Sequence, residues 1–141
     1  MKGYTISSNL EDMDIAVIHE FISHTYWAKG IPKVTLQKAM VNSICFGVFD
    51  GCQRQVGFAR VVSDKATFAY LADVFILPLH RGNGLSKWLM QSIVHHSDLQ
   101  GLRRTMLVTK DAHSLYAQFG FTQVENPQGL MQIWQPDVYQ S

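Results

Sequence analysis

The sequence predicts one α+β domain with a mixed, mostly antiparallel sheet (α/β-type in its second half) flanked by helices. Residues 44–76 contain three apolar strand patterns. These are separated by turn sequences at residues 50–51 and 63–65, an arrangement typical of an antiparallel meander. After Ile76 the pattern changes to helix, buried strand and helix. We therefore expect a right-handed parallel crossover after the meander.

Composition supports a single domain spanning residues 1–141. The chain has 141 residues, 47% hydrophobic and 16% charged, which is enough for one buried core. Its formal net charge is +1 and its basic residues are dispersed, so we expect no nucleic-acid partner. No apolar run is long enough to cross a membrane, and the N-terminus lacks a secretion-signal core. We expect a soluble, cytoplasmic protein with no membrane partner.

Cysteine and histidine spacing argues against a disulfide framework and against a metal site. Cys45 and Cys52 are seven residues apart and do not form a Cys-x-x-Cys motif, so free thiols are expected. None of the six histidines has the helical spacing to a second ligand that zinc requires. We therefore expect no metal.

The N-terminal third is predicted to contain an edge strand and two helices, separated by an aromatic loop. Tyr26 and Trp27 lie in this loop, where they either cover core surface or line a substrate pocket. The expected elements are a strand at residues 4–7, an amphipathic helix from residue 11 to 23, the loop at 24–32 and a short helix at 35–41.

The C-terminal half is predicted to close the sheet. Leu85, Trp88, Leu89 and Ile93 mark one face of a helix. The expected elements after it are a buried strand at residues 105–109, a helix at 112–119 and two closing strands at 121–124 and 130–134.

A glycine-containing turn links the last meander strand to the following helix. Pro78 ends the apolar strand, and Gly82 and Gly84 relax the backbone where the helix begins. Exposed N–H groups, the positive end of the helix dipole and Arg81 together favour binding of a phosphate or pyrophosphate. A plain helix cap is the alternative, since glycine is common at helix boundaries.

Two motifs connect this turn to a known family. Ile76-x-Pro78-x-x-Arg81-Gly-Asn-Gly-Leu-Ser86 is similar to the (Q/R)-x-x-G-x-(G/A) signature of GNAT (Gcn5-related) N-acetyltransferases. Leu115-Tyr-Ala-Gln-Phe-Gly-Phe121 is similar to their L-Y-x-x-x-G-F motif. Ser86 departs from the usual Gly or Ala, and Thr109 stands where Asn is common. The chain thus resembles the GNAT family over nearly its whole length.

The resemblance implies the GNAT acyl-CoA N-acyltransferase fold, with acetyl-CoA as co-substrate. It assigns the pyrophosphate to Arg81, Gly82, Asn83, Gly84, Leu85 and Ser86. It also implies that the backbone of Phe75 and Ile76 pairs with the pantetheine arm between splayed fourth and fifth strands, and that one of these N–H groups stabilises the oxyanion. Tyr116 matches the family tyrosine that contacts the CoA sulfur and protonates the departing thiolate.

Two charged strand residues are candidates for the acceptor side. Asp73 is a catalytic candidate that takes a proton from the amine or anchors its ammonium form, with a structural hydrogen bond as the alternative. Arg60 either pairs with Asp73 or binds a substrate carboxylate. Tyr26 and Trp27 complete the candidate substrate-binding residues.

The predicted activity is transfer of an acetyl group from acetyl-CoA to a primary amine of a small molecule or peptide, by direct attack in a ternary complex. The predicted partners are acetyl-CoA and a small amine, and a homodimer is compatible with the sequence. Two alternatives stay open: a CoA-binding sensor or partner module without turnover, and a transferase for a longer acyl group.

Overall fold

A computed structural model describes residues 1–140 and contains a five-stranded sheet in the order β1-β2-β3-β4-β5. The first four strands pair antiparallel, and β5 runs parallel to β4. The predicted mixed sheet is therefore confirmed. Its strands are β1 (Thr5–Ser7), β2 (Ile44–Phe49), β3 (Gln55–Ser63), β4 (Phe68–Ile76) and β5 (Arg104–Leu107).

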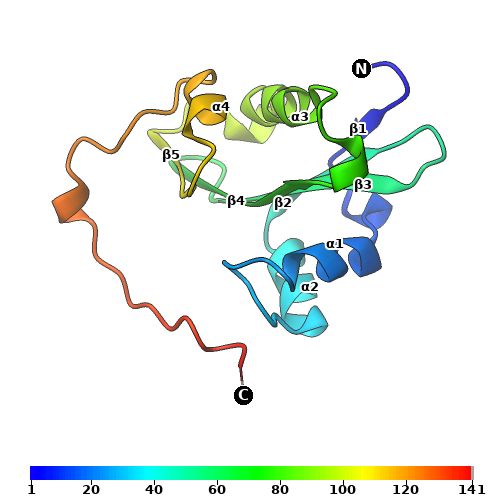
Figure 1. Cartoon of the computed structure of the whole chain (residues 1–141). Helices are drawn as coiled ribbons and strands as arrows, with labels where there is room; N and C mark the ends of the chain where they lie inside the picture. The colour runs from blue at the N-terminus through cyan, green and yellow to red at the C-terminus, as the bar shows by residue number, and fades with distance from the viewer. Residues whose placement is uncertain (141) are drawn as a thin grey trace.

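Helices cover both faces of the sheet. α1 (Ile15–Ile22) and α2 (Lys33–Val41) lie on one face, and α3 (Leu85–Val94) and α4 (His113–Ala117) lie on the other (Figure 1). Four 3-10 turns complete the elements: η1 (Leu10–Asp12), η2 (Pro78–His80), η3 (Ser97–Leu99) and η4 (Pro127–Gly129). None of the helices within residues 1–140 combines the length and hydropathy of a membrane span.

The first amphipathic helix begins later than its sequence pattern predicts. Residues 10–12 form η1, and Asp14 caps α1 by accepting hydrogen bonds from the N–H groups of Ala16 and Val17 at 3.1 and 3.3 Å. A carboxylate at this position satisfies N–H groups that have no partner inside the helix. The predicted apolar stripe is confirmed, because Ile18 and Ile22 are fully buried.

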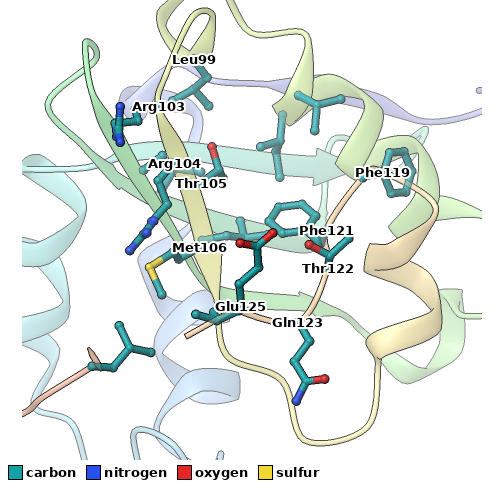
Figure 2. A pocket seen from close by; sticks show the side chains of 18 of the residues that line it. Leu99, Arg103, Arg104, Thr105, Met106, Phe119, Phe121, Thr122, Gln123 and Glu125 are labelled. Carbon is teal, nitrogen blue, oxygen red and sulfur yellow. The ribbon is translucent and has the colours of Figure 1, made fainter. Parts of the chain in front are cut away.

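The two predicted closing strands are wrong. Residues 121–124 and 130–134 have no strand pairing, and the second segment extends away from the sheet (Figure 1). Met131 and Ile133 are 96% and 94% exposed, so their alternation has no neighbouring strand to stabilise it within the described chain. A groove is left open beside β5 where a closing strand would lie (Figure 2).

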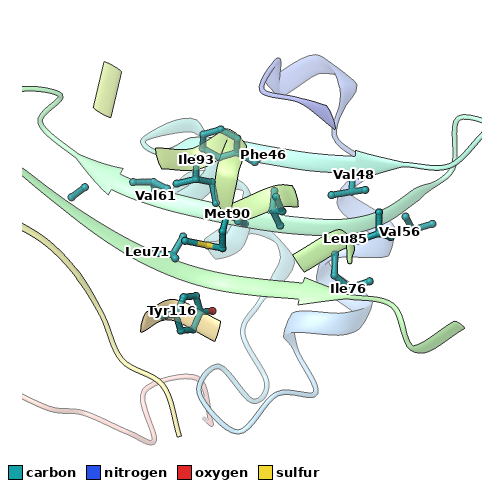
Figure 3. Close-up of a cluster of buried hydrophobic side chains, with 13 residues drawn as sticks. Phe46, Val48, Val56, Val61, Leu71, Ile76, Leu85, Met90, Ile93 and Tyr116 are labelled. Carbon is teal, nitrogen blue, oxygen red and sulfur yellow. The ribbon is translucent and has the colours of Figure 1, made fainter. Parts of the chain in front are cut away.

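The sheet separates two hydrophobic cores. The larger core lies under α3 and α4 and includes Phe46, Leu71, Met90 and Tyr116 (Figure 3). The smaller core lies under α1 and α2. It contains buried residues that include Ile18, Ile22, Leu36, Phe58 and Phe75.

Strand β4 contains one extra residue relative to β3. Phe58 pairs with Phe75 and Arg60 pairs with Ala72, so two steps along β3 match three steps along β4. Asp73, within this β-bulge, has φ of 57°, which is unusual for a residue other than glycine. Since side chains alternate along a strand, the extra residue reverses the faces that follow it.

Candidate active site

A cavity opens where β4 and β5 separate. The two strands pair only between residues 68–71 and 104–107, and β4 then continues to Ile76 with no neighbour on that side in residues 1–140. The cavity has a volume of about 1090 Å³ and is lined by α1, the aromatic loop, the end of β4, the start of α3 and α4. It lies at the carboxyl ends of two parallel strands, a common position for ligand sites.

The glycine turn presents a row of backbone donors next to this cavity, which is lined by Arg81 and Ser86 at the two ends of the turn. Gly82 and Gly84 have φ of 84° and 78°, and Gly84 is the N-cap residue of α3. Within the described chain, the N–H groups of residues 82–87 donate no hydrogen bond, since Trp88 is the first residue of α3 to bond back. Such a turn at a helix N-terminus suits an anion, as the sequence predicts.

Arg81 braces the turn against the strand that precedes it. Its Nε donates a 2.8 Å hydrogen bond to the Ile76 carbonyl, and both residues line the cavity. Ser86 lines the cavity as well, whereas the Leu85 side chain is buried in the core and leaves only its N–H available. The Asn83 side chain donates to the His80 carbonyl at 3.3 Å.

Phe75 and Ile76 anchor the end of β4 in opposite cores. The Phe75 ring stacks on Phe21 with 4.1 Å between ring centroids, while Ile76 belongs to the core under α3. Both residues are 4% exposed. Because both side chains are fixed by packing, their backbone is held rigidly along the free edge of β4, beside the cavity.

Tyr116 projects from α4 to the same cavity. The residue is 9% exposed, and burial raises the pKa of its phenol above the ordinary value. Within residues 1–140, every fully buried side-chain oxygen has a hydrogen-bond partner, whereas the Tyr116 hydroxyl has none. The hydroxyl is therefore not fully buried, and it is accessible from the cavity that Tyr116 lines.

Asp73 is engaged in a structural network instead of facing the cavity. Its two carboxylate oxygens accept hydrogen bonds from Arg60 Nε at 2.8 Å and from Trp27 Nε1 at 2.9 Å, and the residue is 8% exposed. Arg60 also donates to the Ser43 hydroxyl at 3.2 Å. The expected pair of Arg60 and Asp73 is present. This geometry does not support Asp73 as a base or Arg60 as a substrate ligand, because neither residue lines the cavity.

Both aromatic residues of the loop line the cavity. Trp27 is held by Asp73 and packs edge-on against the Tyr26 ring, with centroids 5.1 Å apart. The ammonium of Lys110 lies 5.4 Å from the Tyr26 ring centroid. Tyr26 and Trp27 are 67% and 45% exposed at the cavity mouth, so the pocket-lining alternative fits better than core cover.

Sequence reasoning missed Glu20 and His24, which line the cavity one helical turn apart. His24 Nδ1 lies 2.7 Å from the Glu20 carbonyl oxygen. Glu20 is the one carboxylate among the cavity-lining residues of the described chain. Glu20 could have been predicted as a site residue from its place in the sequence, one turn before the aromatic loop and on the polar side of α1. The described residues contain no cluster of three His, Cys, Asp or Glu side chains able to hold a metal ion.

Comparison with known proteins agrees with this geometry. The sequence profile of the family described as "Acetyltransferase (GNAT) domain" matches residues 42–123. A proposed acetyltransferase of Gibberella zeae is 33% identical, over 82% of this chain and 76% of its own. The crystal structure of a proposed GNAT-family acetyltransferase from Xanthomonas campestris is 51% identical with a TM-score of 0.96, covering 100% of this chain and 99% of its own.

A more distant fold relative was crystallised with CoA. This Mycobacterium tuberculosis protein is 22% identical with a TM-score of 0.68, over 86% of this chain and 73% of its own. The predicted fold is confirmed by these structures. The profile match, which spans more than half of the residues, and the curated relative agree. This chain therefore belongs to the GNAT acetyltransferase family.

Proposed function

We propose that this protein transfers the acetyl group of acetyl-CoA to a primary amine of a small molecule or peptide, by direct attack in a ternary complex. One observation carries the proposal. One cavity is lined by the end of β4, by Tyr116, and by Arg81 and Ser86 of the turn whose residues 82–87 have unpaired N–H groups. An anion site, an unpaired strand edge and a proton donor are the groups that this reaction needs from a protein.

The cofactor side of the cavity is formed by the glycine turn and β4. We assign the pyrophosphate to the N–H groups of residues 82–87, with Arg81 beside them. The pantetheine arm then lies along the β4 edge, as an added strand would. A backbone N–H of Phe75 or Ile76 polarises the thioester carbonyl, because packing on both faces keeps that backbone in place.

The chemical step needs one proton donor and one proton acceptor. The acceptor ammonium first loses a proton to solvent, and the neutral amine nitrogen then attacks the thioester carbon and forms the C–N bond, after which the C–S bond breaks. The leaving thiolate takes the Tyr116 proton, and the resulting phenolate, whose pKa is raised by burial, regains a proton from solvent. The new amide nitrogen loses its proton to solvent or to Glu20, the carboxylate that lines the cavity.

The acceptor side is formed by α1 and the aromatic loop. Glu20 would attract the ammonium form of the acceptor, and Trp27 would provide an apolar wall beside it. In this proposal Asp73 supports the site indirectly, by accepting the hydrogen bond that orients the Trp27 ring. This assignment replaces the expected direct role of Asp73.

Substitution of Tyr116→Phe tests the proposal. We expect turnover of acetyl-CoA with a responsive amine to fall by about 10²-fold or more, as for loss of a general acid, while the Kd for CoA stays unchanged. Product formation is measured by mass spectrometry over an amine panel, which avoids interference from the exposed thiol of Cys52. Tyr70→Phe is the matched control, because Tyr70 lies on β4 outside the cavity lining.

Two outcomes would contradict the proposal. Full activity of Tyr116→Phe would remove the assigned proton donor. CoA binding without product from any amine would favour a CoA-binding sensor or partner module. Faster turnover with propionyl-CoA or succinyl-CoA than with acetyl-CoA would show that the protein transfers a longer acyl group, with the same residues forming the site.

A further inference from the structure

The first four residues of the chain contact the glycine turn from outside the cavity (Figure 1). The Tyr4 hydroxyl lies 3.0 Å from His80 Nδ1, a hydrogen bond between residues 76 positions apart in the sequence. The two rings meet edge-on, with 5.9 Å between their centroids. A Cβ atom at Gly84 would lie 3.3 Å from the Met1 methyl carbon. The segment therefore touches the chain just before the turn and also the N-cap residue of α3.

His80 connects this segment to the turn through its own backbone. Its N–H donates a 2.9 Å hydrogen bond to the Leu77 carbonyl, directly after β4. Its carbonyl accepts a 3.3 Å hydrogen bond from the side chain of Asn83, which lies between Gly82 and Gly84. The position of the His80 ring is thus linked to the middle of the turn by one residue.

Tyr4 is a fixed point to which the His80 ring is attached. Its ring is partly buried and packs against the core under α3 and α4. Its N–H donates to the Met1 carbonyl at 3.2 Å, and the next residue, Thr5, begins β1 and pairs with Phe49 of β2. Because strand pairing and core packing both hold Tyr4, its hydroxyl has little freedom to move.

The glycine turn needs such an attachment if it is to bind an anion well. The N–H groups of residues 82–87 donate no hydrogen bond within residues 1–140, and Gly82 and Gly84 have left-handed backbones. Glycine adopts many other conformations in the absence of restraints, so ordering the turn at the moment of binding would weaken affinity.

We propose that Tyr4 and His80 are positioning residues that hold the glycine turn in its anion-binding conformation before CoA arrives. The inference rests on the proposed assignment of the CoA pyrophosphate to this turn. Neither Tyr4 nor His80 lines the cavity, so both act through the turn and not by contact with the reacting groups.

The test compares two ligands that differ in the pyrophosphate. Tyr4→Phe should raise the Kd for CoA about fivefold, the equivalent of about one net hydrogen bond. The Kd for pantetheine, which has no pyrophosphate, should stay unchanged in the same calorimetric titrations. A general loosening of the fold would weaken both ligands alike. Tyr70→Phe, which changes a tyrosine on β4 outside the cavity lining, is the matched control and should bind both ligands as the wild type does.

A second variant shows whether the two residues act as one pair. His80→Phe keeps an aromatic ring against Tyr4 but removes the bonding nitrogen, so it should also raise the Kd for CoA about fivefold. The double variant Tyr4→Phe/His80→Phe should bind CoA no more weakly than either single variant. An unchanged Kd for Tyr4→Phe, an equal loss for pantetheine, or multiplied losses in the double variant would each overturn the inference.

The binding readout separates this inference from the proposed acetyl transfer. A wild type that binds CoA but acetylates no amine would contradict the proposed function, while the expected Kd changes would still support the positioning roles. A wild type that binds no CoA would overturn both.

Discussion

At the scale of single residues, two carboxylates close to the cavity have different environments. Asp73 is buried and both of its oxygens accept hydrogen bonds, from Arg60 and from Trp27. Glu20 is exposed and lines the cavity. A buried carboxylate with complete hydrogen bonding fixes its neighbours, whereas an accessible one is available to a cationic ligand.

Substitution of each carboxylate by its amide should separate these roles. Glu20→Gln should raise the KM for the amine about tenfold, equivalent to about 1.4 kcal/mol, with little change in unfolding free energy. Asp73→Asn should lower the unfolding free energy by about 3 kcal/mol, because Arg60 would lose its charge partner in a mostly buried position. Steady-state kinetics and urea unfolding measure the two effects. A stable Asp73→Asn variant with a raised amine KM would reverse the assignment.

At the scale of elements, the β3–β4 turn is organised by Asp64. Its carboxylate accepts hydrogen bonds from the Thr67 hydroxyl and from the N–H groups of Ala66, Thr67 and Phe68. These bonds, led by that of the Thr67 hydroxyl, hold the pKa of the Asp64 carboxyl well below its usual range. The turn is thus stabilised by the charged form of one side chain.

The stability of this turn should depend on pH. The folded pKa of Asp64 lies below the unfolded value of about 3.9, so its contribution is present above that value and is lost as pH falls through the folded pKa. Asp64→Asn should therefore cost more unfolding free energy at pH 7 than at pH 3, by urea titration. Asp111→Asn is the control, since its carboxylate accepts no hydrogen bond within residues 1–140. An equal cost of Asp64→Asn at both pH values would contradict the assignment.

The sequence pattern predicts elements that local interactions stabilise, and it misses features that depend on tertiary contacts. Alternation and turn residues identify β2, β3 and β4, because each turn has its own sequence signature. The same alternation at residues 130–134 predicts a strand that has no neighbouring strand among residues 1–140. The bulge at Asp73 is equally hidden, since no glycine marks its positive φ.

The residues of the candidate site also fall into those that a local motif predicts and those that depend on tertiary contacts. The glycine turn and Tyr116 belong to contiguous motifs, so their positions follow directly from the sequence. Glu20 reaches the cavity only because α1 packs across the sheet near the end of β4, a tertiary contact that helical periodicity does not contain. For the same reason, the sequence alone could not decide whether the Asp73 carboxylate faces the cavity or pairs with Arg60.

At the scale of the whole molecule, the sheet is incomplete on both sides of β5. The cavity lies where β4 and β5 separate, and the groove lies along the outer edge of β5. Only four residues of β5 pair with β4, so β5 is held along a shorter length than β2, β3 or β4. Ligand binding at the cavity should therefore stabilise a region that the sheet holds through few strand pairs.

CoA should raise the thermal stability of the entire chain. At a concentration one hundred times its Kd, CoA should add about 2.7 kcal/mol to the unfolding free energy, because it binds the folded state alone. At fixed protein concentration, calorimetry should show one transition that moves upward with CoA, as a single domain requires. Gly82→Ala, which strains the left-handed backbone of the turn, should reduce this shift. Two transitions, of which CoA moves only one, would contradict the single-domain prediction.

The extra residue in β4 makes the length of this strand as important as its composition. Leu71 and Ile76 both point into the core under α3, although they are an odd number of residues apart. Deletion of a single residue between them would exchange the environments of Phe75 and Ile76 and rotate the Arg81 turn away from the cavity. Sequences that share this site should therefore keep the number of residues between Leu71 and Arg81 even where the identity of an exposed side chain in this stretch differs.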